Sequence, residues 1–367
     1  MSEQKTATRQ QGPRKKKMEP TKYSMSGGLV GFLAAQNISL AFSSYQSGKL
    51  YLVGRGPKGG LRVNERFFQK AMGISVQDKD TILLVTAAQI LSFKNTLDPG
   101  QFINQTEDAC FIPRVSYTTG ALDGHDVGQL NDGSLVFVNT RFNCIATLSE
   151  RKGFKPIWKP KFVSQIINED RCHLNGMAIE NGELRYATAV SKSNTIDGWR
   201  DRRDSGGIVI DIKTNKIVCE GLSMPHSPRM HDGKLWVLNS GTGELGWVEV
   251  GKTVKTSKFH PVAFCPGFVR GLSFHGKYAF VGLSKPRYKR FEGLDLDKKL
   301  EEADSEPWCG VQIIDLETGA CVQWLRLDGG VAELYDVGVV PDIACPMSLG
   351  MLTNEIATLL THEELAG

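Results

Sequence analysis

Hydrophobic and polar positions follow one repeated plan along this chain. Five segments each run through a short apolar strand, turn, and continue into a second and more apolar strand. In four of them the turn is Asp-Gly, Asn-Gly or His-Gly, which favours a tight hairpin, and the fifth has the looser turn Asp-Lys-Asp. The segments begin at Ala71, Gly124, Cys172, Pro225 and Phe268. The pattern predicts five pairs of antiparallel strands.

The spacing of the repeat identifies the architecture. An anchor residue in the first strand recurs every 43 to 55 residues, at Gly73, Gly128, Gly176, Pro228 and Gly271. That period is expected of one four-stranded propeller blade with its loops. Two further strand pairs begin at Gly206 and Cys309, and they supply the outer strands of their blades.

Both ends of the chain contribute to a sixth blade. Near the C-terminus, YDVGVV from Tyr335 echoes HDVGQL from His125, and no strand pattern follows it. The missing strands lie near the N-terminus, where LAFSSYQSGKLYLV from Leu40 aligns with LVFVNTRFNCIATL from Leu135. The sequence therefore predicts an all-β, six-bladed β-propeller whose closing blade is shared between N- and C-terminal strands, which removes exposed sheet edges. The alternative is a seven-bladed ring in which Leu40 opens a blade of its own.

The rest of the chain is divided around this ring. Residues 26–346 are expected to form a single propeller domain, preceded by a disordered basic tail over residues 1–25. Residues 287–306 alternate in charge and lack a strand pattern, which predicts a charged helical insertion. Residues 347–367 are expected to form a C-terminal tail or a short helix.

Composition and charge narrow the class of protein. The chain is 41% hydrophobic and 23% charged, which suits a large core, and part of its net charge of +4 comes from the basic tail. A near-neutral body offers no basic face for nucleic acid. The sequence has neither a signal-peptide core nor an apolar stretch of roughly 18 residues, so a cytoplasmic protein without a membrane partner is expected. The eight cysteines are far apart and form no CxxC pair, which predicts reduced thiols.

Polar residues gather where the repeat predicts one face of the ring. In a propeller blade the loop entering the first strand and the loop leaving the second open on the same face, so their side chains converge near the axis. Among the residues that enter first strands are His125, His173, His226, Arg229 and Arg270, the candidate catalytic residues. The candidate ligand-binding residues on this face are Asp126, Asn139, Arg141, Asn175, Trp199, Arg200, Asn239, Thr242 and Lys285.

These residue types allow two kinds of chemistry. Three imidazoles near one axis can bind a divalent transition metal (Zn, Fe, Mn or Cu) and leave a position open for water or substrate. Without a metal they can act as acid–base groups, and the structural alternative is that each one hydrogen-bonds the backbone of a neighbouring blade. Guanidinium groups match carboxylate, sulfate or phosphate, so Arg229 and Arg270 are predicted anion clamps. Trp199 is a candidate stacking surface for a ring or a sugar face.

Several of these segments also carry a resemblance to known proteins. HLNGMA, PHSPR and NSGTGELG, with FVRGL and LYDVG behind them, resemble an uncharacterised bacterial family of conserved hypothetical proteins over about residues 30–346. This resemblance implies one domain and supplies no chemistry. More distantly, the plan is similar to the gluconolactonase, paraoxonase and strictosidine-synthase group of six-bladed propellers, some of which hold a divalent metal on carboxylate and amide ligands. In this chain histidines and arginines stand in place of the acidic ligands, which argues against calcium.

The sequence favours an enzyme over a binding module. We expect a site at the channel mouth for a polar, anionic small molecule or peptide, with the three histidines as metal ligands or acid–base groups. The alternative is a non-catalytic propeller that binds a protein segment or a saccharide on the same face. A propeller fold can host either function.

Overall fold

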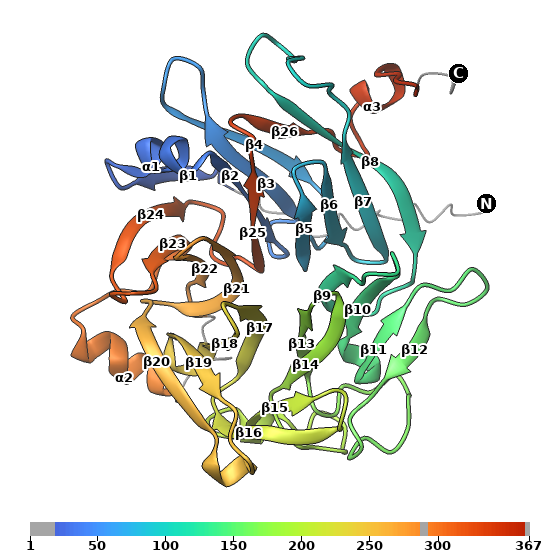
Figure 1. Cartoon of the computed structure of the whole chain (residues 1–367), viewed down its shortest axis with the longest axis vertical. Coiled ribbons are helices and arrows are strands. Elements are labelled where there is room, and N and C mark those ends of the chain that lie inside the picture. The colour runs from blue at the N-terminus through green and yellow to red at the C-terminus, as the bar shows by residue number, and fades with distance from the viewer. Residues whose placement is uncertain (1–18, 287–292, 364–367) are drawn as a thin grey trace, which may run out of the picture.

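Six small sheets stand in a ring in the computed structural model of the chain (Figure 1). The structure describes residues 19–286 and 293–363. Each sheet contains a blade of four antiparallel strands, and in all but the closing blade these strands follow sequence order from the axis outward. The chain is thus a six-bladed β-propeller, as the repeat predicts. Within the described residues, no helix combines the length and the apolar character needed to cross a membrane.

Each blade is built from four strands that are consecutive in the sequence, apart from the closing blade. From the axis outward, the first three blades are β25 (Asp336–Pro341), β2 (Ile38–Ser44), β3 (Lys49–Arg55) and β4 (Leu61–Phe67); β5 (Ile74–Asp78), β6 (Thr81–Val85), β7 (Gln89–Asn95) and β8 (Ala109–Thr118); and β9 (Gly124–Gln129), β10 (Leu135–Asn139), β11 (Cys144–Thr147) and β12 (Lys155–Trp158). The others are β13 (Leu174–Glu180), β14 (Glu183–Ala189), β15 (Gly207–Asp211) and β16 (Lys216–Leu222); β17 (Pro225–His231), β18 (Lys234–Asn239), β19 (Glu244–Glu249) and β20 (Lys258–Phe264); and β21 (Phe268–His275), β22 (Tyr278–Ser284), β23 (Cys309–Asp315) and β24 (Cys321–Asp328).

The closing blade joins the two ends of the chain. β25 pairs antiparallel with β2, so that Val339 lies opposite Leu40, and the shared sixth blade is confirmed. The seven-bladed alternative is wrong, because Leu40 lies in the second strand of this sheet and opens no blade of its own. The outer strand pairs expected from Gly206 and Cys309 are β15–β16 and β23–β24.

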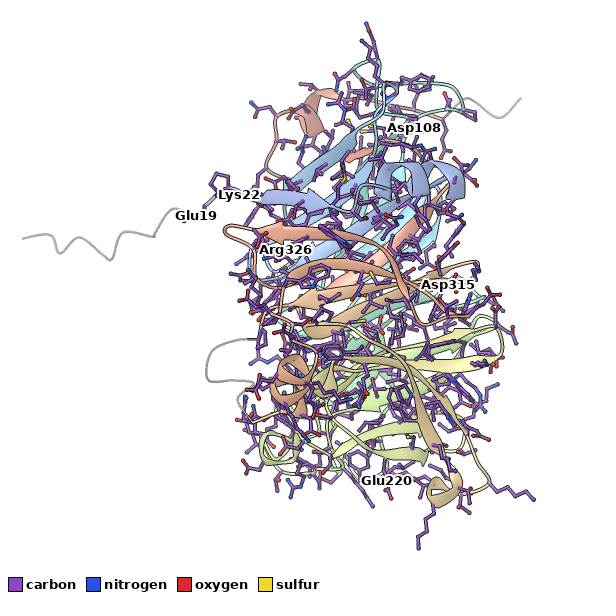
Figure 2. All side chains as sticks on the ribbon, turned by 90° about the vertical axis from the view of Figure 1, so that its left-hand side faces the viewer. Glu19, Lys22, Asp108, Glu220, Asp315 and Arg326 are labelled. Carbon is purple, nitrogen blue, oxygen red and sulfur yellow. The ribbon has the colours of Figure 1, made fainter. Side chains whose placement is uncertain are left out.

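Residues near the N-terminus form more structure than their composition indicates. β1 (Lys22–Met25) adds a fifth, outermost strand to β24, and in the side view of Figure 2 Lys22 lies on the same side of the molecule as Arg326. Helix α1 (Leu29–Gln36) follows and buries two leucines in the core. The prediction of a disordered tail over residues 1–25 is wrong for 22–25, because the free edge of β24 offers backbone hydrogen bonds that local composition does not encode. Residues 1–18 lie outside the described residues.

Two other segments lie outside the four-stranded blades. Helix α2 (Asp295–Glu302) lies in the predicted insertion between β22 and β23, of which residues 287–292 are outside the described part. At the C-terminus, β26 (Pro346–Ser348) pairs in parallel with β8, and the one-turn helix α3 (Glu355–Thr358) follows in the segment predicted as a tail or short helix.

Side chains on alternate inner strands tie neighbouring blades together at the axis. Each accepts a hydrogen bond from a backbone N–H of the next blade. The pairs are Asp336 with Ile74 (2.9 Å), Asp126 with Met177 (3.0 Å) and Ser227 with Gly271 (3.0 Å). The three acceptors align in the sequence as YDV, HDV and HSP. An inner strand has no strand beside it on the axial side, so these side chains satisfy backbone groups that sheet pairing cannot reach.

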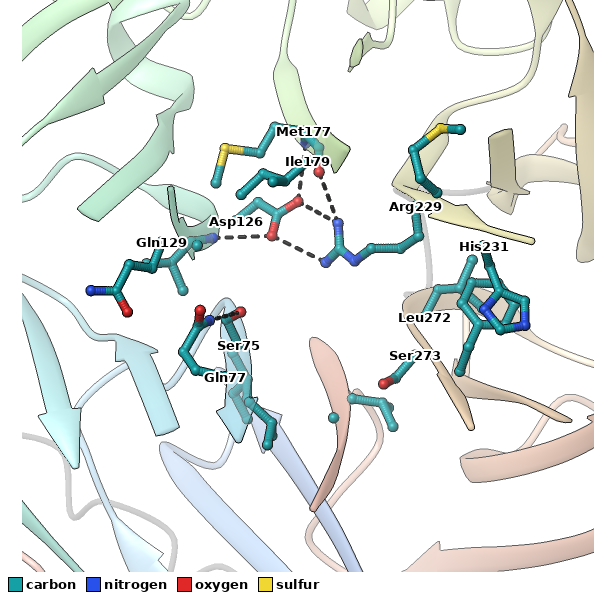
Figure 3. A pocket seen from close by; sticks show the side chains of 18 residues that line it. Ser75, Gln77, Asp126, Gln129, Met177, Ile179, Arg229, His231, Leu272 and Ser273 are labelled. Atoms are coloured by element: carbon teal, nitrogen blue, oxygen red, sulfur yellow. Dashed lines mark hydrogen bonds and ion pairs between the residues drawn. The ribbon is translucent and has the colours of Figure 1, made fainter. Parts of the chain in front are cut away.

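Arg229 crosses the channel and pairs with the buried carboxylate of Asp126 (Figure 3). Its guanidinium donates to both oxygens of Asp126, at 2.8 and 3.1 Å, and lies 3.9 Å from Oδ2 of Asp336. In the alignment of alternate blades it takes the position of Gly128 and Gly338. Beyond it, a pocket of about 410 Å³ opens on the side of the turns that follow the inner strands. Arg229 and Asp126, predicted as anion clamp and ligand-binding residue, are therefore partners of each other inside the channel.

The channel cluster holds two carboxylates against one guanidinium. Burial raises the pKa of Asp336 to about 7, and of its charged neighbours Arg229 opposes this rise while Asp126 adds to it. The excess negative charge can thus be neutralised by a proton near neutral pH.

Replacing Arg229 with methionine should lower the free energy of unfolding by about 3–5 kcal/mol, because two buried carboxylates lose their counterion. Equilibrium unfolding in urea measures the change. The double variant Arg229→Met, Asp126→Asn should recover part of the loss, since one stranded charge is removed together with the cation. A single variant as stable as the wild type would contradict this structural role.

Replacing Asp336 with asparagine should change how stability depends on pH. Because the folded-state pKa lies above the ordinary value of 3.8, this carboxyl contributes stability that is full below about pH 4 and is lost as the pH rises through about 7. The asparagine does not titrate, so the variant should gain stability relative to the wild type as the pH rises from about 4 to about 7. Urea unfolding of both proteins across this range measures the difference, and a constant difference would exclude the titration.

Candidate functional site

A pocket of about 510 Å³ occupies the mouth of the channel, on the face where the chain enters the inner strands. It is lined by Tyr45, Lys70, Met72, Asp123, His125, Asp170, His173, Trp199, Arg200, Asp201, Arg203, Met224, Arg270 and Tyr335. Most of these residues begin inner strands or lie in the loops before them, and residues 199–203 belong to the long loop between β14 and β15. We call this site the channel-mouth pocket.

His173 is held from two sides. The carboxylate of Asp170 accepts from the His173 backbone N–H at 3.0 Å and from ring Nδ1 at 2.6 Å, and His173 adopts a left-handed backbone with φ of 52°. The indole of Trp199 stacks on the imidazole at a centroid distance of 4.2 Å. Burial acts to raise the pKa of Asp170, but the neighbouring His173 outweighs it and the pKa lies below its ordinary value. Asp170 is therefore a carboxylate that orients an imidazole.

His125 is fixed in one tautomer. Its Nδ1 lies 2.8 Å from the carbonyl oxygen of Asp123 and 2.7 Å from the hydroxyl of Thr140, which itself donates to the carbonyl of Leu174. Because a carbonyl can only accept, Nδ1 carries the hydrogen and Nε2 keeps a lone pair. Burial is the main cause that lowers the pKa of His125 to about 4, so the ring is neutral at pH 7.

His226 repeats the arrangement of His125 two blades further on. Its Nδ1 lies 2.8 Å from the carbonyl oxygen of Met224 and 2.9 Å from the hydroxyl of Ser240, which donates to the carbonyl of Val269. The pKa of His226 lies well below its ordinary value. Burial is the main cause, and the positive charge of Arg270 lowers the pKa further. His226 does not line the channel-mouth pocket, and its buried Nε2 has no hydrogen-bond partner among the described residues.

Arg270 lines the pocket and contacts two aromatic rings. Its guanidinium carbon is 5.1 Å from the ring centre of Phe268 and 5.3 Å from that of Tyr335. It makes no hydrogen bond or ion pair with any side chain or carbonyl in the described part of the chain, and its Nε is buried without a partner there. An unpaired guanidinium in a pocket is a site for a carboxylate, phosphate or sulfate.

The helical insertion supports one wall of the pocket. Three leucines from the α2 segment, Leu294, Leu296 and Leu300, pack in one cluster with Trp199 and Phe268. The guanidinium of Arg200 also packs over the Trp199 ring, with its carbon 4.5 Å from the ring centre. Trp199 thus packs against His173, Arg200 and the insertion, so it positions His173 and is not a free stacking surface for a sugar.

The structure brings together five of the predicted site residues, namely His125, His173, Trp199, Arg200 and Arg270. The other nine do not line this pocket. Asp126 and Arg229 pair in the channel, and His226 and Asn175 are buried outside the pocket lining. Asn139 and Asn239 bond the backbone N–H groups of Phe142 and Ser223, while Thr242 donates to Glu244 or to the carbonyl of Asn239. Arg141 donates to the carbonyl of Ala121, and Lys285 lies 3.3 Å from Asp328.

A metal on the three histidines stays a prediction. Only His125 and His173 of the three line the pocket, with ring centres 4.9 Å apart and the rings nearly perpendicular. Across residues 19–286 and 293–363, no group of three or more His, Cys, Asp or Glu side chains is arranged to hold a metal ion.

Sequence reasoning missed three important members of the pocket, Asp123, Asp170 and Tyr335. Tyr335 stands in YDVGVV where His125 stands in HDVGQL, so the echo between these segments already placed it at the channel mouth. Asp170 and Asp123 precede the inner strands in loops without a repeated pattern, and no periodic signal marks them.

The fold and this pocket define a six-bladed β-propeller with a polar, charged site at one mouth of its channel. The chain belongs to the family described as a domain of unknown function, DUF4915, whose model matches residues 27–349. This membership agrees with the resemblance to an uncharacterised family over nearly the whole propeller. No curated protein matches the chain.

Solved propeller structures resemble the chain at low identity. The nidogen/laminin complex contains a chain with a TM-score of 0.48 and 11% identity, covering 83% of this chain and 99% of that one. Virginiamycin B lyase from Staphylococcus aureus has a TM-score of 0.40 and 10% identity, covering 84% and 99%. A protein of unknown function from Bacteroides caccae has a TM-score of 0.38 and 9% identity, covering 83% and 98%. Nothing about the chemistry of the pocket follows from these likenesses.

His125 should remain neutral, with its hydrogen on Nδ1, between about pH 5.5 and pH 8, because burial holds its pKa at about 4. Long-range ¹H–¹⁵N spectra of the histidine rings report both protonation and tautomer, and the His125→Gln variant assigns the signal. A ring that titrates near its ordinary value of 6.5, or carries its hydrogen on Nε2, would contradict the geometry.

Proposed function

We propose that the channel-mouth pocket is an acid–base catalytic site for a polar, anionic small molecule. His173 exchanges a proton with the bound molecule, and Arg270 binds its anionic group. The observation that carries the proposal is an imidazole held by a carboxylate at 2.6 Å in a pocket that also contains an unpaired guanidinium. Orienting carboxylate, imidazole and anion-binding cation are the parts that proton-transfer enzymes combine.

The two pocket histidines take different roles in this proposal. Asp170 fixes Nδ1 of His173, so that Nε2 is the nitrogen left to accept a proton, and the carboxylate stabilises the imidazolium that results. His125 stays neutral and offers Nε2 as a hydrogen-bond acceptor for the bound molecule. Neither role requires a metal.

A cytoplasmic location fits the thiols. All eight cysteines are unpaired, and seven of them are buried. Free thiols are typical of a reducing compartment. Burial raises the pKa of several of them, such as Cys110 to about 11, so they are unreactive at neutral pH.

The proposal is tested by comparing the wild type with a His173→Ala variant. The wild type should convert an anionic metabolite, and the variant should lose this activity. Thermal-shift profiling against a panel of small carboxylates and phosphates first identifies anions that bind, and mass spectrometry then follows their conversion. We expect turnover to fall roughly 10²- to 10⁴-fold in His173→Ala and Asp170→Asn, with binding retained, because the proton transfer is lost. Arg270→Met should instead weaken binding of the anion.

His260 supplies a matched control for His173. It also pairs with a carboxylate, Glu249 at 2.9 Å, and stacks on an indole, Trp247 at 4.4 Å, but it lies on the outer strand β20. His260→Ala should leave turnover unchanged. Anions that bind without being converted would favour the non-catalytic propeller, and equal turnover in His173→Ala would exclude His173 as the proton-transfer group.

A further inference from the structure

We infer that the molecule bound in the channel-mouth pocket is a zwitterion that carries both an ammonium and a carboxylate, as a free amino acid or a short peptide does. The inference deepens the proposed function, because it concerns the same pocket, but it depends on charges that the proton-transfer step does not use. These charges belong to Arg270 and Asp123, and both residues line the pocket.

Arg270 supplies the site for the carboxylate. Its guanidinium has aromatic contacts with Phe268 and Tyr335 and no hydrogen-bond acceptor among the described residues. Arg229, the cation inside the channel, is satisfied within the protein because it pairs with Asp126. The donors of Arg270 are therefore left for a ligand, and a carboxylate can accept two of them at once.

Asp123 supplies the site for the ammonium. Its carbonyl accepts from His125, and its backbone has a φ of 53°, so the residue is fixed in place. Its carboxylate, in contrast, makes no hydrogen bond or ion pair within the described ranges. Of the two other acidic residues in the pocket lining, Asp170 pairs with His173 and Asp201 is exposed to solvent.

The charges of Arg270 and Asp123 act on the same side chains but do not pair with each other. Arg270 lowers and Asp123 raises the pKa of Tyr335, and the same two residues act in opposite directions on His125. In the described part of the chain no ion pair joins Arg270 to Asp123, so the two charged groups are not in direct contact. A ligand that carries both charges satisfies both residues, whereas a simple anion leaves the carboxylate of Asp123 without a counterion.

A buried hydroxyl beside Arg270 is an independent sign of a missing ligand. Tyr335 is 6% exposed, and its Oη has no hydrogen-bond partner among residues 19–286 and 293–363. Burial raises its pKa well above the ordinary value of 10, so the group is a hydrogen-bond donor at neutral pH. Buried polar groups in folded proteins are almost always paired, and a carboxylate on Arg270 would give this hydroxyl its acceptor.

The size of the pocket agrees with a small zwitterion. Its volume of about 510 Å³ lies within the range of roughly 300–1,000 Å³ for small-molecule sites. A free amino acid and a short peptide both fit this volume and share the same terminal charges.

Matched ligand pairs test the inference by isothermal titration calorimetry. Alanine, leucine, phenylalanine and glutamate are compared with propanoate, 4-methylpentanoate, 3-phenylpropanoate and glutarate, which lack only the ammonium. Dipeptides of these residues are compared with their N-acetyl forms, which separates peptides from free amino acids as the source. We expect at least one zwitterion to bind the wild type tenfold or more tightly than its partner.

Asp123→Asn should abolish this preference without weakening the binding of the ammonium-free acid, because the carboxylate that is lost does not attract an anion. Arg270→Met should instead weaken the binding of both members of a pair. Asp204→Asn is the matched control, because Asp204 is an exposed aspartate near the pocket that does not line it. Equal binding of both members of every pair, or no binding of any zwitterion, overturns the inference. Anions that still bind through Arg270 and are still turned over by His173 would leave the proposed function standing.

Discussion

The structure depends on how the innermost strands of the ring are satisfied at the axis. A propeller gives each inner strand a partner on its outer side and none on its axial side, so some backbone N–H groups point toward a narrow channel. In this chain aspartate and serine side chains on alternate strands accept those hydrogen bonds from the next blade. Two of the acceptors are charged, and Arg229 supplies the opposite charge where the equivalent strands carry glycine.

This bracing at the axis also sets the positions of the site. The residues directly before the three acceptors are His125, His226 and Tyr335. A hydroxyl from the turn that follows the second strand of the same blade lies beside each histidine. The rings are therefore placed by the same backbone that closes the channel. Charges of the cluster reach the pocket as well, since Asp336 and Asp126 both raise the pKa of Tyr335. The channel-mouth pocket and the axial hydrogen bonds of the ring therefore depend on the same inner-strand residues.

The repeat in the sequence is sufficient to predict the fold, because the anchors at Gly73, Gly128 and Gly176 record the period of a blade directly. It also predicts that His125, His173 and Arg270 share one face, since loop position fixes the face. It does not predict which way a side chain turns on an inner strand. His125 and Asp126 are adjacent in sequence, yet one lines the mouth and the other pairs inside the channel.

The other differences between the predicted and observed roles of site residues also arise from contacts or backbone conformations that local sequence does not encode. Arg229 carries the guanidinium expected of an anion clamp, but its partner Asp126 comes from two blades away, a contact that no local pattern contains. Asn139 accepts from the N–H of Phe142 in the turn after its own strand, and Asn239 accepts from the N–H of Ser223 in the connection that enters its blade, so both are polar for structural reasons. Asp170 acts through the left-handed turn that ends in His173, and that conformation is not evident from the residues alone.

The N-terminal segment links the closing blade to the blade before it, since β1 belongs to the sheet of β24 and β2 to the sheet of β25. We call the β25–β2 pairing, where the two ends of the chain meet, the seam of the ring. During synthesis, β2, β3 and β4 emerge before the other five blades but must wait for β25, which follows all of those blades, before their own blade has an inner strand. Ring closure is thus postponed until the other five blades have been synthesised, and contacts of such long sequence separation make folding slow. A chain interrupted before Asp336 would expose the axial edge of β2 and lose the carboxylate that braces Ile74, so that the seam of the ring would stay open.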